Sequence, residues 1–385
     1  MKTEIMKTEA AEMKKLGFGT MRMPLHNPED PTDLDVEQVC RMVDVFLEQG
    51  FTYFDTAYMY HKYESERVVK KALVDRYPRE RFVLADKLPL SHLKQKEDME
   101  RFFNEQLEKC GVEYFDYYLL HNVSRAYYEV AEKLDAFGFA KEKKAAGRIK
   151  KLGFSFHADA ELLEHILKTH PEVEFVQLQL NYIDWDSLSI QSRQCYEICR
   201  RYGKEVIVME PVKGGILAQV PEEAEKLMKS YAPKLSPASW AIRFAASQEG
   251  VIMVLSGMSD MDQMLDNISY MKEFQPLNEE EQAIIRRVTE IINASIAVAC
   301  TGCQYCVEGC PKQIPIPRYF ALYNQFRQFA EKSNSRGYYA NYQKTHGMAK
   351  DCIGCRKCEK ICPQHLSIAD LMKDVSAVFD VQPEA

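Results

Sequence analysis

Short apolar runs rich in β-branched residues alternate with longer helical stretches between Leu16 and about Asn267. The runs that predict strands are Leu16–Gly19, Thr52–Asp55, Phe82–Lys87, Tyr117–His121, Lys151–Ser155, Phe175–Leu180, Glu205–Glu210 and Val251–Ser256. Strands that alternate with helices indicate parallel βα units, and eight such units favour an α/β fold with a closed (β/α)₈ TIM barrel. Because the carboxyl ends of the strands meet on one face of such a barrel, we expect the chemistry of the chain there.

The pattern changes after the barrel. Aromatic residues at spacings of three and four predict one amphipathic helix; they are Tyr319, Phe320, Tyr323, Phe326 and Phe329. The 385 residues exceed one average domain, but a barrel of about 250 residues and a small module account for them. We therefore predict a mobile tail over residues 1–15, a barrel over 16–285, and a small, mostly α-helical domain of the bacterial-ferredoxin kind over 286–385.

Charge and hydropathy exclude two classes of partner. The net charge is −7, and Lys and Arg are interleaved with Asp and Glu, so no basic field favours nucleic acid. No apolar run approaches the roughly 18 residues that span a bilayer. The charged start of the chain has no apolar signal region. We expect a cytoplasmic protein without a nucleic-acid or membrane partner.

Twelve cysteines are unusual for a reducing compartment unless most of them hold metal. Eight of them form two runs with the spacing C-x₂-C-x₂-C-x₃-C, each followed by proline. The runs are Cys300, Cys303, Cys306 and Cys310, and Cys352, Cys355, Cys358 and Cys362. This spacing predicts two [4Fe–4S] clusters, each bound by three cysteines of one run and the fourth of the other. Two zinc sites are the alternative, but zinc ribbons favour paired C-x₂-C knuckles.

By that rule the two clusters share both runs. The predicted ligands of the first cluster are Cys300, Cys303, Cys306 and Cys362. Those of the second cluster are Cys310, Cys352, Cys355 and Cys358. The other four cysteines are interpreted as small apolar residues; they are Cys40, Cys110, Cys195 and Cys199.

Polar residues stand where several strands are predicted to end. Asp55 ends the second strand and Tyr60 follows in the loop, while Lys87 and His121 end the third and fourth strands. With Gly17-Phe18-Gly19-Thr20 before it, this quartet resembles the Asp/Tyr/Lys/His tetrad of the aldo/keto reductase superfamily. With the cysteine module attached, the chain resembles the ferredoxin-fused branch of that family. The resemblance covers nearly all residues beyond the first fifteen.

The resemblance implies an oxidoreductase that acts on a small carbonyl or alcohol substrate. Tyr60 would be the acid that protonates the developing alkoxide, and a phenol needs a nearby cation to lower its pKa. Lys87 would supply that cation, Asp55 would hold Lys87, and His121 would orient the substrate oxygen. The alternative is that these four polar side chains only solvate the barrel mouth.

The resemblance also implies a nicotinamide cofactor, NAD(H) or NADP(H), at the barrel mouth. Ser155 and Gln177 match the family's carboxamide contacts, whereas Phe156 replaces an Asn and Met209 replaces a stacking Tyr. Phosphate and adenosine are expected where the last strand leads into a helix, whose first N–H groups suit anions. The residues expected there are Gly257, Ser259, Gln263 and Asn267. Because Gly257 and Gln263 replace the Lys and Arg that often pair with a 2′-phosphate, the sequence argues against a preference for NADP.

Alternatives remain because nicotinamides give electrons in pairs and [4Fe–4S] clusters exchange them singly. FMN can split the pair, and a mouth widened by Met209 and the Lys213-Gly214-Gly215 turn could accept it. A plain NAD(P)H-dependent carbonyl reductase with structural clusters is a second alternative. An electron-carrier or redox-sensing protein that uses the barrel only as a docking scaffold is a third, from a different class. If the clusters relay electrons, the expected partner is ferredoxin or another one-electron carrier.

Overall fold

The computed structural model describes residues 13–187, 190–294, 296–298, 300, 302, 304–329, 335–344, 346–362 and 364–380. The described residues form two compact units. The first unit comprises the chain up to Trp185, Ser192–Pro211 and Ala241–Pro276. The second comprises Asp186–Gln191, Val212–Trp240 and the chain from Leu277 onward. The predicted boundaries after residues 15 and 285 stay predictions, and most of the predicted tail lies outside the described residues.

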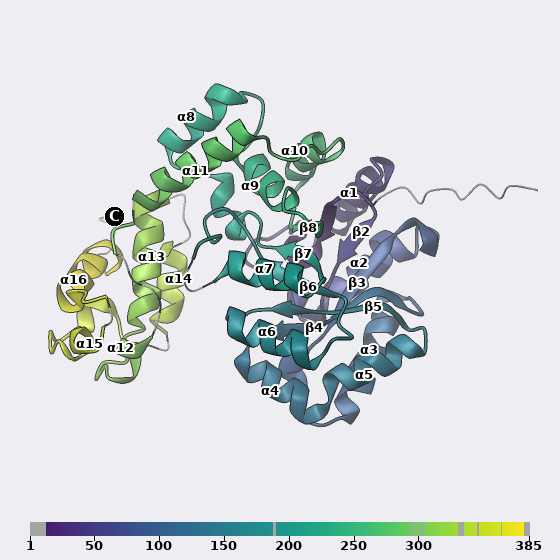
Figure 1. Ribbon diagram of the computed structural model, residues 1–385, viewed down its shortest axis with the longest axis horizontal. Coiled ribbons are helices and arrows are strands. Elements are labelled where there is room, and N and C mark those ends of the chain that lie inside the picture. Colours follow the sequence, from purple (N-terminus) through teal and green to yellow (C-terminus); the bar gives the residue numbers. More distant parts are fainter. Residues whose placement is uncertain are drawn as a thin grey trace, which may run out of the picture. The chain divides into compact units, whose positions relative to one another are not determined.

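Eight parallel strands in sequence order close into a barrel (Figure 1). The strands are β1 (Leu16–Gly19), β2 (Tyr53–Asp55), β3 (Val83–Leu88), β4 (Phe115–Val123), β5 (Ile149–Phe156), β6 (Phe175–Gln179), β7 (Glu205–Met209) and β8 (Val251–Ser256). The predicted TIM barrel is confirmed, and each of the eight predicted strands is present. The largest difference is in β4, which continues past His121 through a shift of register between Leu120 and Val123. His121 therefore lies inside β4 and not at its end.

Helices flank the strands of the barrel (Figure 1). Those of the first unit are α1 (Val36–Glu48), α2 (Ser65–Val69), α3 (Glu97–Cys110), α4 (Arg125–Leu134), α5 (Ala136–Ala145), α6 (Ala160–Thr169), α7 (Ser192–Arg201) and α10 (Met261–Met271). Helix α9 (Pro237–Ala246) runs across the division between the two units. Side-chain oxygens accept backbone N–H bonds at four N-termini and so fix where these helices begin; the caps are Asp35, Ser124, Asp159 and Asp260.

Apolar side chains from six of the eight strands fill one layer of the barrel interior. This layer contains Tyr53, Ala85, Leu119, Phe175, Ile207, Met253 and Leu255. Gly153 on β5 makes room for it, because a Cβ there would lie 2.6 Å from the Phe175 ring and 2.5 Å from its backbone oxygen. The packed interior leaves only the ends of the barrel for a site.

The second unit is helical in its described part, as the sequence predicted for the C-terminal region. Its helices are α8 (Glu222–Tyr231), α11 (Glu279–Ala294), α12 (Tyr305–Glu308), α13 (Ile316–Phe329), α14 (Ser335–Tyr342), α15 (Lys357–Lys360) and α16 (Ile368–Phe379). The predicted aromatic helix is α13, and it buries Tyr319, Phe320 and Tyr323. No described helix of either unit combines the length and apolar character that a membrane crossing requires.

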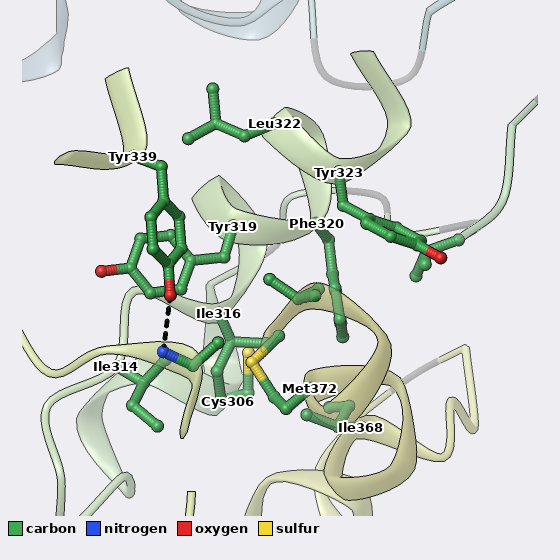
Figure 2. Close-up of a cluster of buried hydrophobic side chains, with 13 residues drawn as sticks. Cys306, Ile314, Ile316, Tyr319, Phe320, Leu322, Tyr323, Tyr339, Ile368 and Met372 are labelled. Atoms are coloured by element: carbon green, nitrogen blue, oxygen red, sulfur yellow. Dashed lines mark hydrogen bonds between the residues drawn. The ribbon is translucent and has the colours of Figure 1, made fainter. Parts of the chain in front are cut away.

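The core of this C-terminal region packs α13 against α14 and α16 (Figure 2). The Tyr319 and Tyr339 rings lie 4.4 Å apart between centroids. The Tyr339 hydroxyl accepts the Ala349 N–H at 2.8 Å, which is the dashed line in Figure 2, and it donates to Asp380 at 2.9 Å. These bonds fix the segment that leads into the second cysteine run.

Candidate functional site

Lys87 stands at the centre of a buried polar group at the carboxyl ends of β2 and β3. Its Nζ lies 2.5 Å from Asp55 Oδ1, 2.7 Å from the Thr56 carbonyl oxygen and 3.2 Å from Tyr60 Oη. Lys87 is 1% exposed and Asp55 is 3% exposed. An ammonium and a carboxylate this deeply buried persist only as a pair, because either alone costs several kcal/mol to desolvate.

Tyr60 is held by an unusual loop that His61 anchors. Three successive non-glycine residues, His61, Lys62 and Tyr63, have left-handed backbones, with φ of 50°, 50° and 77°. The buried His61 ring ties them down: Nδ1 lies 2.9 Å from the Pro31 oxygen, and Nε2 accepts the Met23 N–H at 3.3 Å. No apolar or charge pattern in the sequence marks this role of His61.

His121 lies beside Tyr60. The two ring centroids are 6.0 Å apart and nearly perpendicular. Burial, followed by the nearby Lys87 charge, lowers the pKa of His121 well below its usual value, so the ring is neutral at pH 7. Its Nδ1 is buried and makes no hydrogen bond to any described residue. A neutral imidazole donates one hydrogen bond and accepts another.

The electrostatics of Tyr60 differ in one respect from the expectation. Burial raises the pKa of Tyr60, and the Lys87 ammonium opposes this without reversing it. For Lys87, burial lowers the pKa, but Asp55 and Tyr60 together outweigh burial and raise it. The expected net lowering of the Tyr60 pKa is therefore wrong for this structure, because the cost of burying a phenolate exceeds the attraction of Lys87.

The residues expected to contact nicotinamide lie on β5, β6 and β7. The buried Ser155 hydroxyl accepts the Asn122 N–H at 2.7 Å, and Gln177 Nε2 donates to Asp55 Oδ2 at 3.2 Å. Gln177 thus extends the Lys87 group. Phe156 is buried, whereas Met209, at the end of β7, is half-buried. Their ligand contacts stay predictions.

The residues expected at the adenosine end bond mainly to one another. Asp260 caps α10 by accepting the Gln263 N–H at 2.8 Å, and Gln263 Oε1 accepts the Ser259 N–H at 3.0 Å. Asn267 donates to Ser256 Oγ at 2.9 Å and accepts from Tyr270. Gly257 is exposed, and the aliphatic part of the Arg22 side chain lies against it. A carboxylate at the start of α10 opposes an additional phosphate there.

A second buried polar group lies behind Lys87, and it was not predicted from the sequence. Asp86 accepts the Lys87 N–H at 2.7 Å, and the Cys110 thiol lies 3.7 Å from Asp86 Oδ2. Lys109 Nζ lies 3.4 Å from the fully buried Glu66. Burial, and then the other carboxylate, raises the pKa of Asp86 well above its usual value. Alternation along β3 was the available signal, because it points Asp86 away from Lys87.

The described cysteines of the two runs gather around two separate pockets in the C-terminal region. Cys310, Cys352, Cys355 and Cys358 line one pocket, which has an empty volume of about 390 Å³ partly open to solvent. Cys300, Cys306 and Cys362 line the other, of about 320 Å³. Cys303 lies outside the described residues. Among the residues that the structure describes, no group of three or more His, Cys, Asp or Glu is arranged to hold a single metal ion.

Three of the remaining cysteines are buried and one is half-buried. Burial raises the pKa of the Cys195 thiol to about 12, and it also raises that of Cys110 and Cys199. Protonated, buried thiols behave as small apolar side chains. The interpretation of Cys195 and Cys199 as packing residues agrees with this burial.

Relatives share the barrel. A curated relative named "Uncharacterized oxidoreductase YqkF", from Bacillus subtilis, is 22% identical over 307 residues, 72% of this chain and 93% of the relative. "Probable aldo-keto reductase 1" from Glycine max is 28% identical over 221 residues, 54% of this chain and 58% of the relative.

Solved structures have the same fold. The holo form of aldo-keto reductase AKR11C1 from Bacillus halodurans has a TM-score of 0.58 and 24% identity, covering 71% of this chain and 91% of that one. An aldo-keto reductase from Klebsiella pneumoniae in complex with NADPH has a TM-score of 0.56 and 21% identity, and the match covers 72% of this chain and 91% of that one.

Family models match both parts of the chain. The 4Fe-4S dicluster domain model matches residues 299–366 and includes both cysteine runs. The aldo/keto reductase family model matches residues 15–290, which include all eight strands and the Lys87 group. The chain therefore belongs to the aldo/keto reductase family, and it is an oxidoreductase that carries a 4Fe-4S dicluster domain after its barrel.

Proposed function

We propose that this protein interconverts a small carbonyl compound and its alcohol at the barrel mouth and exchanges the electrons with a one-electron partner through two [4Fe–4S] clusters. The observation that most directly supports this proposal is the buried group around Lys87. Its Nζ lies 3.2 Å from Tyr60 Oη and 2.5 Å from Asp55 Oδ1. An acid, a cation and a carboxylate in this order suit proton transfer to a carbonyl oxygen.

In this proposal Tyr60 gives its Oη proton to the substrate oxygen, or takes it back in alcohol oxidation. The raised pKa keeps Tyr60 protonated before reaction, and Lys87 stabilises the phenolate once the proton has left. Asp55 holds Lys87 in place, and Gln177 holds Asp55. The neutral His121 ring orients the substrate oxygen by a hydrogen bond.

We propose a nicotinamide dinucleotide as the hydride carrier, with Ser155, Gln177 and Met209 at its nicotinamide end. When bound, it supplies a hydride to the carbonyl carbon. The NADPH complex of the Klebsiella pneumoniae structure supports a nucleotide at this mouth. The Asp260 carboxylate at the start of α10 favours NAD(H) over NADP(H), because it repels a 2′-phosphate. The expected contacts at that end are Gly257, Ser259, Gln263 and Asn267.

We propose two [4Fe–4S] clusters, one in each cysteine pocket. Thiolates fit this group, and each cluster exchanges one electron when bound. Four described thiols line the larger pocket and come from both runs, which supports the predicted set of Cys310, Cys352, Cys355 and Cys358. The set for the smaller pocket is Cys300, Cys306 and Cys362, with Cys303 as the fourth ligand.

An anaerobic visible spectrum of the intact protein tests the proposal. NADH is added first and NADPH second, followed by a panel of aldehydes, ketones and alcohols. Bleaching of the cluster absorbance is the expected result. Because a nicotinamide gives its electrons as a pair and each cluster takes one, flavin bands would identify FMN as the group that divides the pair. Turnover without bleaching would favour a plain carbonyl reductase with structural clusters.

Substitution of Tyr60 by Phe separates the enzyme from an electron carrier with an idle barrel. Y60F should lose about 10²-fold or more in turnover, because the general acid is removed. The control is Y58F, since the Tyr58 hydroxyl bonds to Glu105 and not to Lys87. Equal activity of Y60F and Y58F would refute the assigned role of Tyr60.

A further inference from the structure

The two cysteine runs have matching backbones at an offset of 52 residues. Gly302 and Gly354 both have left-handed backbones, with φ of 70° and 67°. A short helix follows at the same place in each run, α12 (Tyr305–Glu308) and α15 (Lys357–Lys360). Left-handed residues also match at Gln304 and Arg356, and again at Gln313 and His365. The two runs are therefore repeats of one structural unit, which we call repeat 1 and repeat 2.

The amino-acid sequences of the two repeats differ in charge at equivalent positions. Repeat 1 has, in order, Thr301, Gln304, Tyr305 and Glu308. Repeat 2 has Ile353, Arg356, Lys357 and Lys360 at the same positions. Since the backbones match, binding of a cluster does not require the basic residues. They give repeat 2 more basic side chains than repeat 1.

Ile353, Arg356 and Lys357 of repeat 2 line the pocket of about 390 Å³, and so does Lys312 of repeat 1. Lys312, Arg356 and Lys357 line it together with Cys355, and the described residues that line it include no acidic side chain. Arg356 is paired with Glu359 and Asp370. The other pocket is lined by apolar side chains such as Phe320 and Leu366, and no charged residue is among its described lining.

The centre of this surface is apolar and exposed. Ile353 is 62% exposed, and Cys355 is exposed as well. The Lys312 and Lys357 side chains are exposed and form no ion pair with any residue in the described ranges. An exposed apolar residue with a rim of unpaired cations is typical of a surface that binds an acidic protein.

We propose that Ile353, Lys312 and Lys357, around the exposed Cys355, form the docking surface for a small acidic one-electron carrier protein of the ferredoxin or flavodoxin kind. This proposal rests on the proposed function of the clusters. Oxidation of one alcohol to the carbonyl releases two electrons and two protons. Two carrier molecules, each reduced by one electron at this surface, accept the electrons, and carbonyl reduction consumes the same two electrons in reverse.

Binding of the intact, cluster-loaded protein to an acidic ferredoxin, measured anaerobically by calorimetry, tests the proposal. A basic c-type cytochrome serves as the control carrier. Affinity for the ferredoxin should fall at least about tenfold between about 0.01 M and about 0.15 M ionic strength, because the Debye length falls from roughly 30 to roughly 8 Å. The cytochrome should bind more weakly at both ionic strengths.

The variant K312E/K357E should weaken ferredoxin binding about tenfold or more at low ionic strength, mainly through slower association. I353S should weaken binding at both ionic strengths, since its contribution is apolar. The control K71E/K272E makes the same change in net charge on exposed lysines of the barrel unit. It should bind ferredoxin like the wild type.

Three outcomes would overturn the docking surface. The first is that K312E/K357E binds ferredoxin as tightly as the wild type, and the second is that K71E/K272E loses as much affinity as K312E/K357E. The third is that the protein binds anionic lipid vesicles but not ferredoxin. Iron content and the visible spectrum of each variant distinguish a wrong docking surface from a wrong proposed function. Absence of cluster absorbance in the wild type would refute the clusters themselves. Normal absorbance without carrier binding would refute only the docking surface.

Discussion

The variant Lys87→Met should destabilise the barrel much more than loss of an ordinary ion pair. Both members of the Lys87–Asp55 pair are nearly inaccessible, with side chains 1% and 4% exposed. Removing the ammonium leaves the Asp55 carboxylate buried with Gln177 as its remaining described side-chain donor. Breaking a buried pair from one side costs about 3–5 kcal/mol, because the remaining charge keeps its desolvation cost without its partner.

The same reasoning gives the sign of the pH dependence. Burial already raises the pKa of Asp55, and Lys87 opposes that rise. In K87M the opposition is gone, so the folded state holds a proton on Asp55 at pH values where the unfolded chain has released it. The free energy of unfolding should then fall as pH rises from about 4 toward the folded pKa, by at most about 1.4 kcal/mol per pH unit.

The assay is anaerobic urea unfolding followed by circular dichroism at several pH values. The control is K150M, because Lys150 lies 2.8 Å from Asp116 but is 55% exposed, and Asp116 keeps Arg79 at 2.6 Å. K150M should lower the free energy of unfolding by at most about 1 kcal/mol. The double variant D55N/K87M should regain most of the stability of the wild type but no activity. The buried charge on Asp55 would be refuted if K87M were as stable as K150M and if its free energy of unfolding did not change with pH.

Three further substitutions probe packing, hydrogen bonding and cofactor choice. Gly153→Ala should lower the free energy of unfolding by about 1–3 kcal/mol in urea titrations, since its Cβ would lie 2.5 Å from the Phe175 oxygen; a neutral effect would contradict the close packing. Tyr339→Phe should lower the free energy of unfolding by about 1–3 kcal/mol and reduce iron retention, because it leaves the buried Ala349 N–H without a partner. The control Tyr338→Phe, at a residue that is 49% exposed, should change neither quantity. Asp260→Asn keeps a good helix cap but removes its charge, so fluorescence titration should show NADPH binding strengthened relative to NADH; an unchanged ratio would place the 2′-phosphate elsewhere.

The barrel was predictable from the sequence because strands buried on both faces leave a clear apolar signal. That signal fails where polar residues continue a strand. β4 runs on through His121 and Asn122, and Asn122 has a left-handed backbone with φ of 60°. The hydrogen bond from Asn122 N–H to Ser155 stabilises this irregular strand end, and no local pattern announces a bond between residues 33 positions apart.

The Lys87 group could be anticipated because its members stand at the ends of neighbouring parallel strands. Its surroundings could not, since they depend on which way side chains turn after the chain has folded. His61 anchors the Tyr60 loop through two distant backbone groups, and Asp86 supports the Lys87 backbone from behind. At the other end of the mouth, Gln263 and Asn267 satisfy the chain's own polar groups.

The sharing of each cysteine pocket between both repeats has a consequence for the making of this protein. Cys310 reaches the thiols of repeat 2, and Cys362 reaches those of repeat 1. During synthesis, neither proposed ligand set is complete until the ribosome has passed position 358 for one and 362 for the other, about a hundred residues after the last barrel strand ends at Ser256. Iron and sulfide must then be inserted after the barrel has been made, and a chain truncated between the repeats would offer neither cluster its full set of thiols.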